Sequence, residues 1–133
     1  MGTTAELPEC LSIIVCDDIY RDEETKKLVI VGTFNNIKAA EFPCRHGQLS
    51  VLFTLTNGRG AYDLALGIEH AESGCALIEM RGPLTLEDPL QIADFNVKLA
   101  GVEFPAPGKY WVCVRINGEL VRQRPFLVSR VGE

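Results

Sequence analysis

The chain has 133 residues, 47% of them hydrophobic and 23% charged, and a formal net charge of −5. This length suits one domain rather than two, and the apolar content is sufficient to fill a core. The negative net charge argues against a dedicated nucleic-acid binder. No apolar run approaches the roughly 20 residues that a membrane helix requires, so we expect no membrane insertion.

The cysteines predict an intracellular redox environment. Their number is odd, their spacing is wide, and none forms a Cys-x-x-Cys pair, which indicates reduced thiols rather than a disulfide framework. The N-terminal residues show no positive region leading into an apolar stretch, so we expect no secretory signal and a cytoplasmic location. The five cysteines are Cys10, Cys16, Cys44, Cys75 and Cys113.

The beginning of the chain predicts a short tail followed by a hairpin. Residues 1–9 show no periodicity and predict a disordered or extended N-terminus, with a single β-sandwich domain over residues 10–133. Two apolar segments, 11–20 and 28–34, predict strands joined by the polar connection 21–27. Because both strands are rich in apolar residues, we expect this hairpin to be well covered.

Alternation of apolar and polar residues dominates the middle and end of the chain. Residues at every second position share one face of a strand, so each alternating segment predicts one buried and one wetter side. No segment of helical length shows apolar residues at a spacing of 3.6, so the sequence predicts an all-β protein. The alternating apolar residues are Leu49, Val51, Phe53 and Leu55, then Tyr62, Leu64, Leu66 and Ile68, then Tyr110, Val112, Val114 and Ile116.

Turns and changes of parity complete the predicted fold. Asn117-Gly118 tolerates the positive φ angles of a type I′ turn and predicts the last hairpin. The segment 90–104 changes its apolar parity twice, which predicts bulges near Ala93-Asp94 and near Gly101. About seven or eight strands result. We therefore expect a two-sheet immunoglobulin-like sandwich, with a small β-barrel as the alternative.

Two parts of the chain resemble a bacterial family of uncharacterised small proteins, and the resemblance covers most of the sequence. It implies an immunoglobulin-like sandwich with no assigned activity, and it lends no functional residue. The residues that carry it are Asp17–Asp22, Thr25–Leu28, Gly32–Ile37 and Phe42-Pro43, followed by Pro107–Tyr110, Val112, Asn117–Glu119 and Arg124-Pro125.

The tyrosine of the penultimate strand resembles, in part, the tyrosine corner of antibody-type domains. Such domains place this tyrosine two residues before a cysteine that forms the inter-sheet disulfide. Here Tyr110 stands three residues before Cys113, so the cysteine faces the opposite side and no such disulfide is expected. Tyr110 follows the Pro107-Gly108 turn and is still predicted to form a corner-like hydrogen bond.

The last hairpin supplies the predicted binding surface. Residues 109–133 carry a net charge of +3, against −8 for the rest of the chain. With a two-residue turn, Trp111 lies opposite Arg124 and Cys113 opposite Arg122, on the face that also carries Arg115. Tryptophan and arginine are typical of protein contact sites. One alternative is that Arg124 only stacks on Trp111 in a cation–π contact. Another is that a three-residue loop, or a bulge before Pro125, turns Arg122 and Arg124 inward, although their charge disfavours this.

A metal- or thiol-dependent function is the alternative to an interaction module. Cys44, His46 and His70 could contribute to a metal site or to a small-molecule or thiol enzyme, although their spacing matches no familiar zinc pattern and Cys44-Arg45-His46 is predicted to lie in a loop. The sequence contains no Gly-x-Ser-x-Gly motif. We therefore predict a non-enzymatic module without catalytic residues, metal or cofactor, which binds a protein partner or forms a homo-oligomer through Trp111, Arg115, Arg122 and Arg124.

Overall fold

The structure, a computed structural model, describes residues 6–132 and contains nine strands within them. The all-β prediction is confirmed, while the strand number exceeds the seven or eight expected. One reason is β3, which has only four residues and is too short to show alternation. The strands are β1 (Glu9–Arg21), β2 (Leu28–Thr33), β3 (Asn36–Ala39), β4 (Cys44–Thr56), β5 (Gly60–His70), β6 (Ala76–Leu86), β7 (Ile92–Phe104), β8 (Gly108–Ile116) and β9 (Glu119–Arg130).

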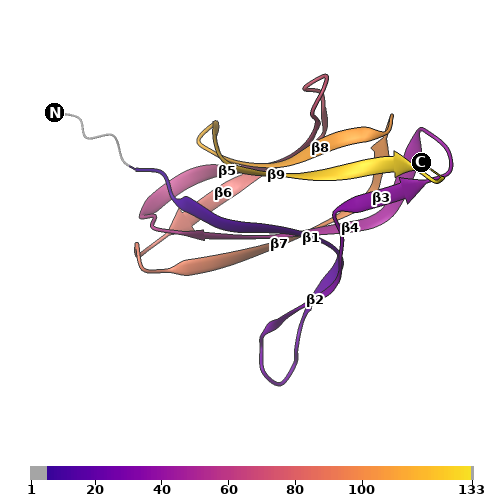
Figure 1. Cartoon of the computed structure of the whole chain (residues 1–133). Helices are drawn as coiled ribbons and strands as arrows, with labels where there is room; N and C mark the ends of the chain where they lie inside the picture. The colour runs from indigo at the N-terminus through magenta and orange to yellow at the C-terminus, as the bar shows by residue number, and fades with distance from the viewer. Residues whose placement is uncertain (1–5, 133) are drawn as a thin grey trace.

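The strands form two sheets that face each other (Figure 1). One sheet has the order β2-β1-β4-β7, and the other has the order β3-β9-β8-β5-β6. All neighbours are antiparallel except β3 and β9, which run parallel. Two separate sheets fit the predicted sandwich rather than its alternative, a single closed barrel.

The N-terminal segment joins the first sheet early. Glu6–Pro8 have no regular structure, β1 begins at Glu9, and residues 1–5 of the predicted tail lie outside the described residues. Pro8 is buried, and a Cβ atom added at Gly58 would lie 2.7 Å from its ring. Part of the predicted tail is thus packed on the domain. Among residues 6–132 no helix is long and apolar enough to cross a membrane.

The core lies between the sheets and follows the predicted alternation. Tyr110, Val112 and Val114 are completely buried, whereas Trp111 between them is only half-buried. Full burial of a large apolar side chain contributes about 1.5–3 kcal/mol, so the shared interior is the main source of stability. The largest fully buried side chains of this core are Tyr110, Phe53, Phe104, Phe126, Leu49, Leu55, Ile68, Leu86 and Ile116.

An aromatic cluster closes one end of the core around Tyr110. Its hydroxyl donates a 2.5 Å hydrogen bond to the carbonyl of Ala106, which confirms the predicted corner. The Tyr110 ring lies 5.0 Å from Phe104, 5.9 Å from Phe126 and 4.9 Å from His70, measured between centroids. Pairs at these separations add to the gain from burial.

The two predicted irregularities of β7 have different outcomes. Gly101 has a φ of +65° and the buried parity changes there, as predicted, but no bulge is present, because β7 keeps the same register with β4 on both sides of Gly101. No bulge occurs at Ala93-Asp94, where β7 keeps one register with β4. The prediction was wrong because it assumed that Ile92 is buried, whereas its exposure is 66%.

The hairpin of β1 and β2 departs most from expectation. The last residues of β1, the turn and the first residues of β2 extend away from both sheets (Figure 1), and we call residues 18–31 the arm. The prediction that this hairpin is well covered was therefore wrong. The arm thus combines exposed apolar side chains, Tyr20 and Val31, with a position outside the sandwich.

Candidate functional site

The register of the last hairpin differs from the predicted one. Ile116 pairs with Glu119 as expected, but a bulge leaves Val121 unmatched, so Val114 pairs with Arg122 and Trp111 pairs with Pro125. Cys113 consequently lies opposite Gln123. A shift of one residue moves a strand's side chains to the other face. The predicted pairings of Trp111 with Arg124 and of Cys113 with Arg122 are wrong, and both arginines belong to the inner face.

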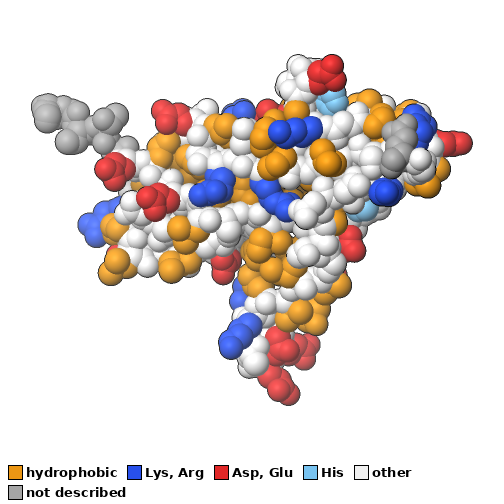
Figure 2. Space-filling view, viewed as in Figure 1, with side chains coloured by type: hydrophobic (Ala, Val, Ile, Leu, Met, Phe, Trp, Pro, Cys, Tyr) orange, Lys and Arg blue, Asp and Glu red, His pale blue; other side chains and the backbone are white. Residues whose placement is uncertain are grey.

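These two arginines make different contacts within the chain, Arg122 across the seam between β1 and β9 and Arg124 with the connection between β2 and β3. Arg122 Nε donates a 2.6 Å hydrogen bond to the carbonyl of Cys10 on the opposite sheet. Arg124 Nη2 donates to Asn35 Oδ1, while its Nη1 is buried and has no hydrogen-bond partner among residues 6–132. Figure 2 shows basic side chains in the middle of this face, between the layers. Their contacts indicate a structural function at the seam.

The outer face of β8 retains only two of its four predicted residues, Trp111 and Arg115. Lys109, rather than Arg124, lies over the Trp111 ring, with Nζ 4.3 Å from the centroid. Arg115 Nη1 contacts Glu69 Oε2 at 2.6 Å, and this hydrogen bond raises the pKa of Arg115 above its ordinary value. Both cations therefore have partners within the chain. Partner binding at Trp111 and Arg115 stays a prediction.

The residues of the alternative metal or thiol site lie on strands. Cys44 and His46 belong to the beginning of β4, not to a loop, and His70 ends β5. The His46 ring lies 5.9 Å from Phe34, and His70 Nδ1 lies 3.2 Å from Ser73 Oγ. No group of three or more metal-ligating side chains is found among the described residues. A metal or thiol function stays a prediction.

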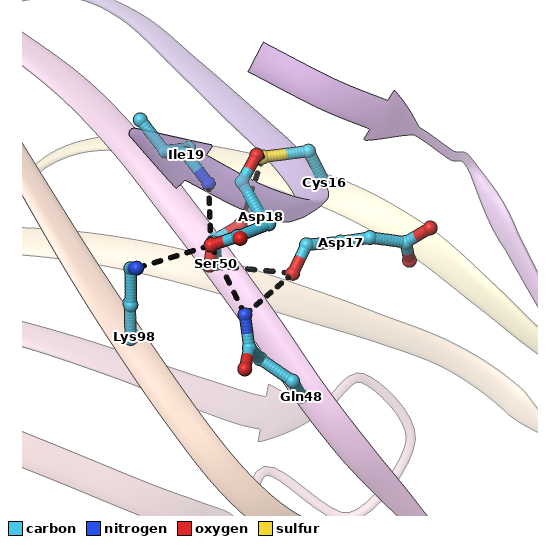
Figure 3. A network of polar contacts seen from close by, with 7 residues as sticks. All are labelled: Cys16, Asp17, Asp18, Ile19, Gln48, Ser50 and Lys98. Carbon is cyan, nitrogen blue, oxygen red and sulfur yellow. Dashed lines mark hydrogen bonds and ion pairs between the residues drawn. The ribbon is translucent and has the colours of Figure 1, made fainter. Parts of the chain in front are cut away.

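Polar contacts join the base of the arm to the neighbouring strands of its sheet (Figure 3). Asp18 Oδ1 accepts hydrogen bonds from the Ile19 N–H at 2.8 Å and from Gln48 Nε2 at 3.1 Å. Lys98 Nζ, from β7, lies 3.1 Å from the same oxygen. The Lys98 hydrogen bond, with that of the Ile19 N–H, lowers the pKa of Asp18 below its ordinary value. Asp18 therefore connects the arm to two other strands of the sheet.

Apolar packing supports one face of the arm. Ile19 is completely buried and forms a second, smaller cluster with Cys16 and Leu52 on the outer side of the four-stranded sheet. Leu28 and Ile30 of β2 pack against this cluster. The cluster is separate from the main core. The base of the arm is thus fixed by its own small apolar centre.

The other face of the arm is exposed and apolar. Tyr20 pairs with Val29, and Asp18 pairs with Val31, so these residues alternate with the packed ones. Tyr20 is 51% exposed and Val31 is 45% exposed, and Val29 is half-buried. Figure 2 shows apolar side chains along the arm and charged side chains at its tip. Sequence reasoning missed this surface, although the unbroken apolar run 28–31 indicates a strand with two apolar faces.

The turn at the tip is well defined. Asp22 Oδ1 accepts hydrogen bonds from the N–H groups of Glu24 and Thr25, both at 2.9 Å. Arg21 Nη1 donates to the carbonyl of Lys26 at 2.6 Å, and the Lys26 N–H donates to the carbonyl of Asp22. An aspartate that caps a turn in this way restricts the backbone. The tip therefore keeps β1 and β2 together beyond the sheet.

Fold and site together define a two-sheet all-β domain with a projecting, partly apolar hairpin. The chain matches the family of unknown function DUF6941 over residues 11–129, and it belongs to that family. This confirms the resemblance to an uncharacterised family, and the matched range includes the whole arm. A search of the curated proteins finds no match.

Proposed function

We propose that this protein is a protein-interaction module that docks through the exposed face of the arm. The observation that carries the proposal is the exposure of Tyr20 and Val31, 51% and 45%, on a hairpin that leaves the sandwich. Apolar side chains grouped on a projecting element mark contact sites, because water is displaced from them when a partner binds. The proposed role is binding rather than catalysis.

The architecture of the arm supports this role. Its base is fixed by the Asp18 contacts and by the cluster around Ile19, so it presents Tyr20 in a defined position. A surface that is ordered before binding loses less conformational entropy on association. Tyrosine adds a large apolar area with a polar tip and few rotatable bonds, as is common at interfaces.

Photo-crosslinking in intact cells tests the proposal. With Tyr20 replaced by benzoylphenylalanine, we expect illumination to give a discrete crosslinked product whose components are identified by mass spectrometry. A second substitution, Val31→Lys, should remove the product because it places a charge in the apolar contact. The matched control is benzoylphenylalanine at Ile92, which is 66% exposed on β7 of the same sheet.

Two results contradict the proposal. One is the absence of any product from position 20. The other is the same product from position 92, which would show that crosslinking follows exposure and not docking. The alternative function at Cys44, His46 and His70 has its own test, which is elemental analysis of the purified protein. Detection of a metal in stoichiometric amount would favour this alternative over a simple binding role.

A further inference from the structure

The outer face of β3, β8 and β9 groups apolar side chains with two lysines. Residues that lie opposite each other in an antiparallel pair share a face, so Leu127 lies beside Lys109, and Pro125 lies beside Trp111. The pairing of β3 with β9 places Lys38 on the same face. Leu127 is 51% exposed, Pro125 and both lysines are exposed, and Trp111 is half-buried. We call these five residues the outer patch.

The outer patch is basic, although the chain as a whole has a net charge of −5. The outward-facing positions of β3, β8 and β9 include the cations Lys38, Lys109 and Arg115 and no carboxylate. Arg115 is paired with Glu69 of β5. Neither lysine forms an ion pair with any described residue. The uncompensated positive charge of this face is therefore carried by Lys38 and Lys109.

We propose that the outer patch binds an acidic, extended segment of a partner protein. An apolar side chain of that segment packs on Trp111, Pro125 and Leu127, which supply the area that is removed from water. Its carboxylates pair with Lys38 and Lys109, and this charge complementarity selects the partner. Lys109 Nζ lies 4.3 Å from the centroid of the Trp111 ring, so a carboxylate that pairs with it also lies close to the ring.

The charge of the whole chain favours an acidic peptide over a nucleic acid or an anionic membrane as the occupant. Those two ligands present closely spaced negative charges over a long surface, and a chain with a net charge of −5 repels them outside the patch. A short peptide segment contacts the patch alone, where its carboxylates meet the two unpaired lysines. The basic area is therefore large enough for a peptide and too small for a polyanion.

The outer patch is separate from the arm. It lies on the five-stranded sheet, whereas the arm projects from the four-stranded sheet on the other side of the molecule (Figure 1). The inference therefore goes beyond the proposed function, and either surface can fail its test without the other. Two contact surfaces on opposite layers allow the domain to hold two partners at once.

Fluorescence of Trp111, the only tryptophan in the chain, reports binding at the outer patch directly. The probe is a blocked peptide of sequence Glu-Leu-Glu-Phe-Glu-Leu, and its control has glutamine in place of each glutamate. We expect a saturable change of the Trp111 emission when the acidic peptide is titrated into the full chain. The glutamine peptide should bind about tenfold more weakly, because it lacks the charges that pair with the lysines.

Charge reversal places the interaction at the patch. Lys109→Glu should weaken binding of the acidic peptide by about tenfold or more, because like charges then meet. Lys27→Glu is the matched control, since it makes the same charge change on the arm, and it should alter the affinity by less than about twofold because distant charges are screened. The double variant Lys38→Glu/Lys109→Glu should bind the peptide that has lysine in place of each glutamate.

Three results overturn the inference, provided that circular dichroism shows each variant folded like the wild type. The first is no binding of the acidic peptide up to about 1 mM. The second is equal weakening by Lys27→Glu and Lys109→Glu, which would assign the effect to net charge. The third is tighter binding of oligothymidine or phosphatidylserine vesicles than of the peptide. Unchanged crosslinking from position 20 in Lys109→Glu keeps the arm's own test separate.

Discussion

Three cysteine side chains are buried in surroundings that disfavour the thiolate. Burial raises the pKa of Cys10, Cys16 and Cys113 above the ordinary value, and nearby carboxylates add to this effect at Cys16 and Cys113. Cys44 is half-buried and Cys75 is exposed. Because the thiolate is the reactive form, these environments set an order of reactivity.

We predict that a thiol reagent at neutral pH labels Cys75 first, Cys44 more slowly, and the other three only after unfolding. The pKa shifts also fix a pH dependence. A thiol with a raised pKa in the folded state keeps its proton longer than in the unfolded state, so stability is lost as the pH rises above about 8.5. Mass spectrometry of labelled peptides checks the order. Rapid labelling of Cys16 in folded protein would contradict it.

Arg122 and Arg124 of β9 differ in their hydrogen bonding. Arg122 donates a hydrogen bond to the Cys10 carbonyl, whereas one buried nitrogen of Arg124 has no partner in the part of the chain that the structure describes. A buried donor without a partner destabilises by about 1–3 kcal/mol. Removal of Arg124 therefore relieves a cost, while removal of Arg122 creates one.

We predict that Arg122→Met lowers the free energy of unfolding by about 1 kcal/mol, a value kept small because Arg122 is exposed at the rim. Arg124→Met should cost less than this or be stabilising, since methionine retains the apolar contacts of the side chain. Urea denaturation of both variants under identical conditions measures the difference. A larger loss for Arg124→Met would show that its hydrogen bond to Asn35 outweighs the unpaired nitrogen.

Local patterns in the sequence predicted individual elements better than their placement. The alternation around Tyr110 and the Asn117-Gly118 turn were sufficient to predict β8 and the turn of the last hairpin. The inward position of Arg122 could be raised from the sequence only as the disfavoured alternative, because it depends on one unmatched residue, Val121, which no local pattern marks. Similarly, the apolar composition of 28–31 shows that β2 is a strand, but not that the hairpin leaves the sheet.

At the scale of the whole molecule, one core joins the two sheets. Residues from both sheets, such as Val51 and Phe53 of β4 and Val112 and Val114 of β8, belong to a single cluster. The parallel pairing of β3 with β9 adds a contact between segments about 90 residues apart in the chain, for example Ile37 with Val128. Contacts over such separations cannot be inferred from alternation, which describes only local structure.

Because the sheets share this core, we predict a single cooperative unfolding transition. Fluorescence of Trp111, the only tryptophan, reports on the five-stranded sheet, and labelling of Cys16 reports on the four-stranded sheet. Their midpoints in denaturant should coincide, as expected of a two-state domain of this size. Exposure of Cys16 well before the change at Trp111 would instead indicate that the four-stranded sheet opens separately.

The small apolar centre around Ile19 separates the arm from the main interior. Substitutions at Tyr20 or Val31 remove no side chain from that interior, so they can alter which molecules the protein recognises without a large loss of stability. A sandwich built in this way can serve as a constant scaffold on which recognition changes by a few surface mutations. For protein engineering, the exposed positions Tyr20 and Val31 are accordingly the ones to randomise when a new specificity is sought.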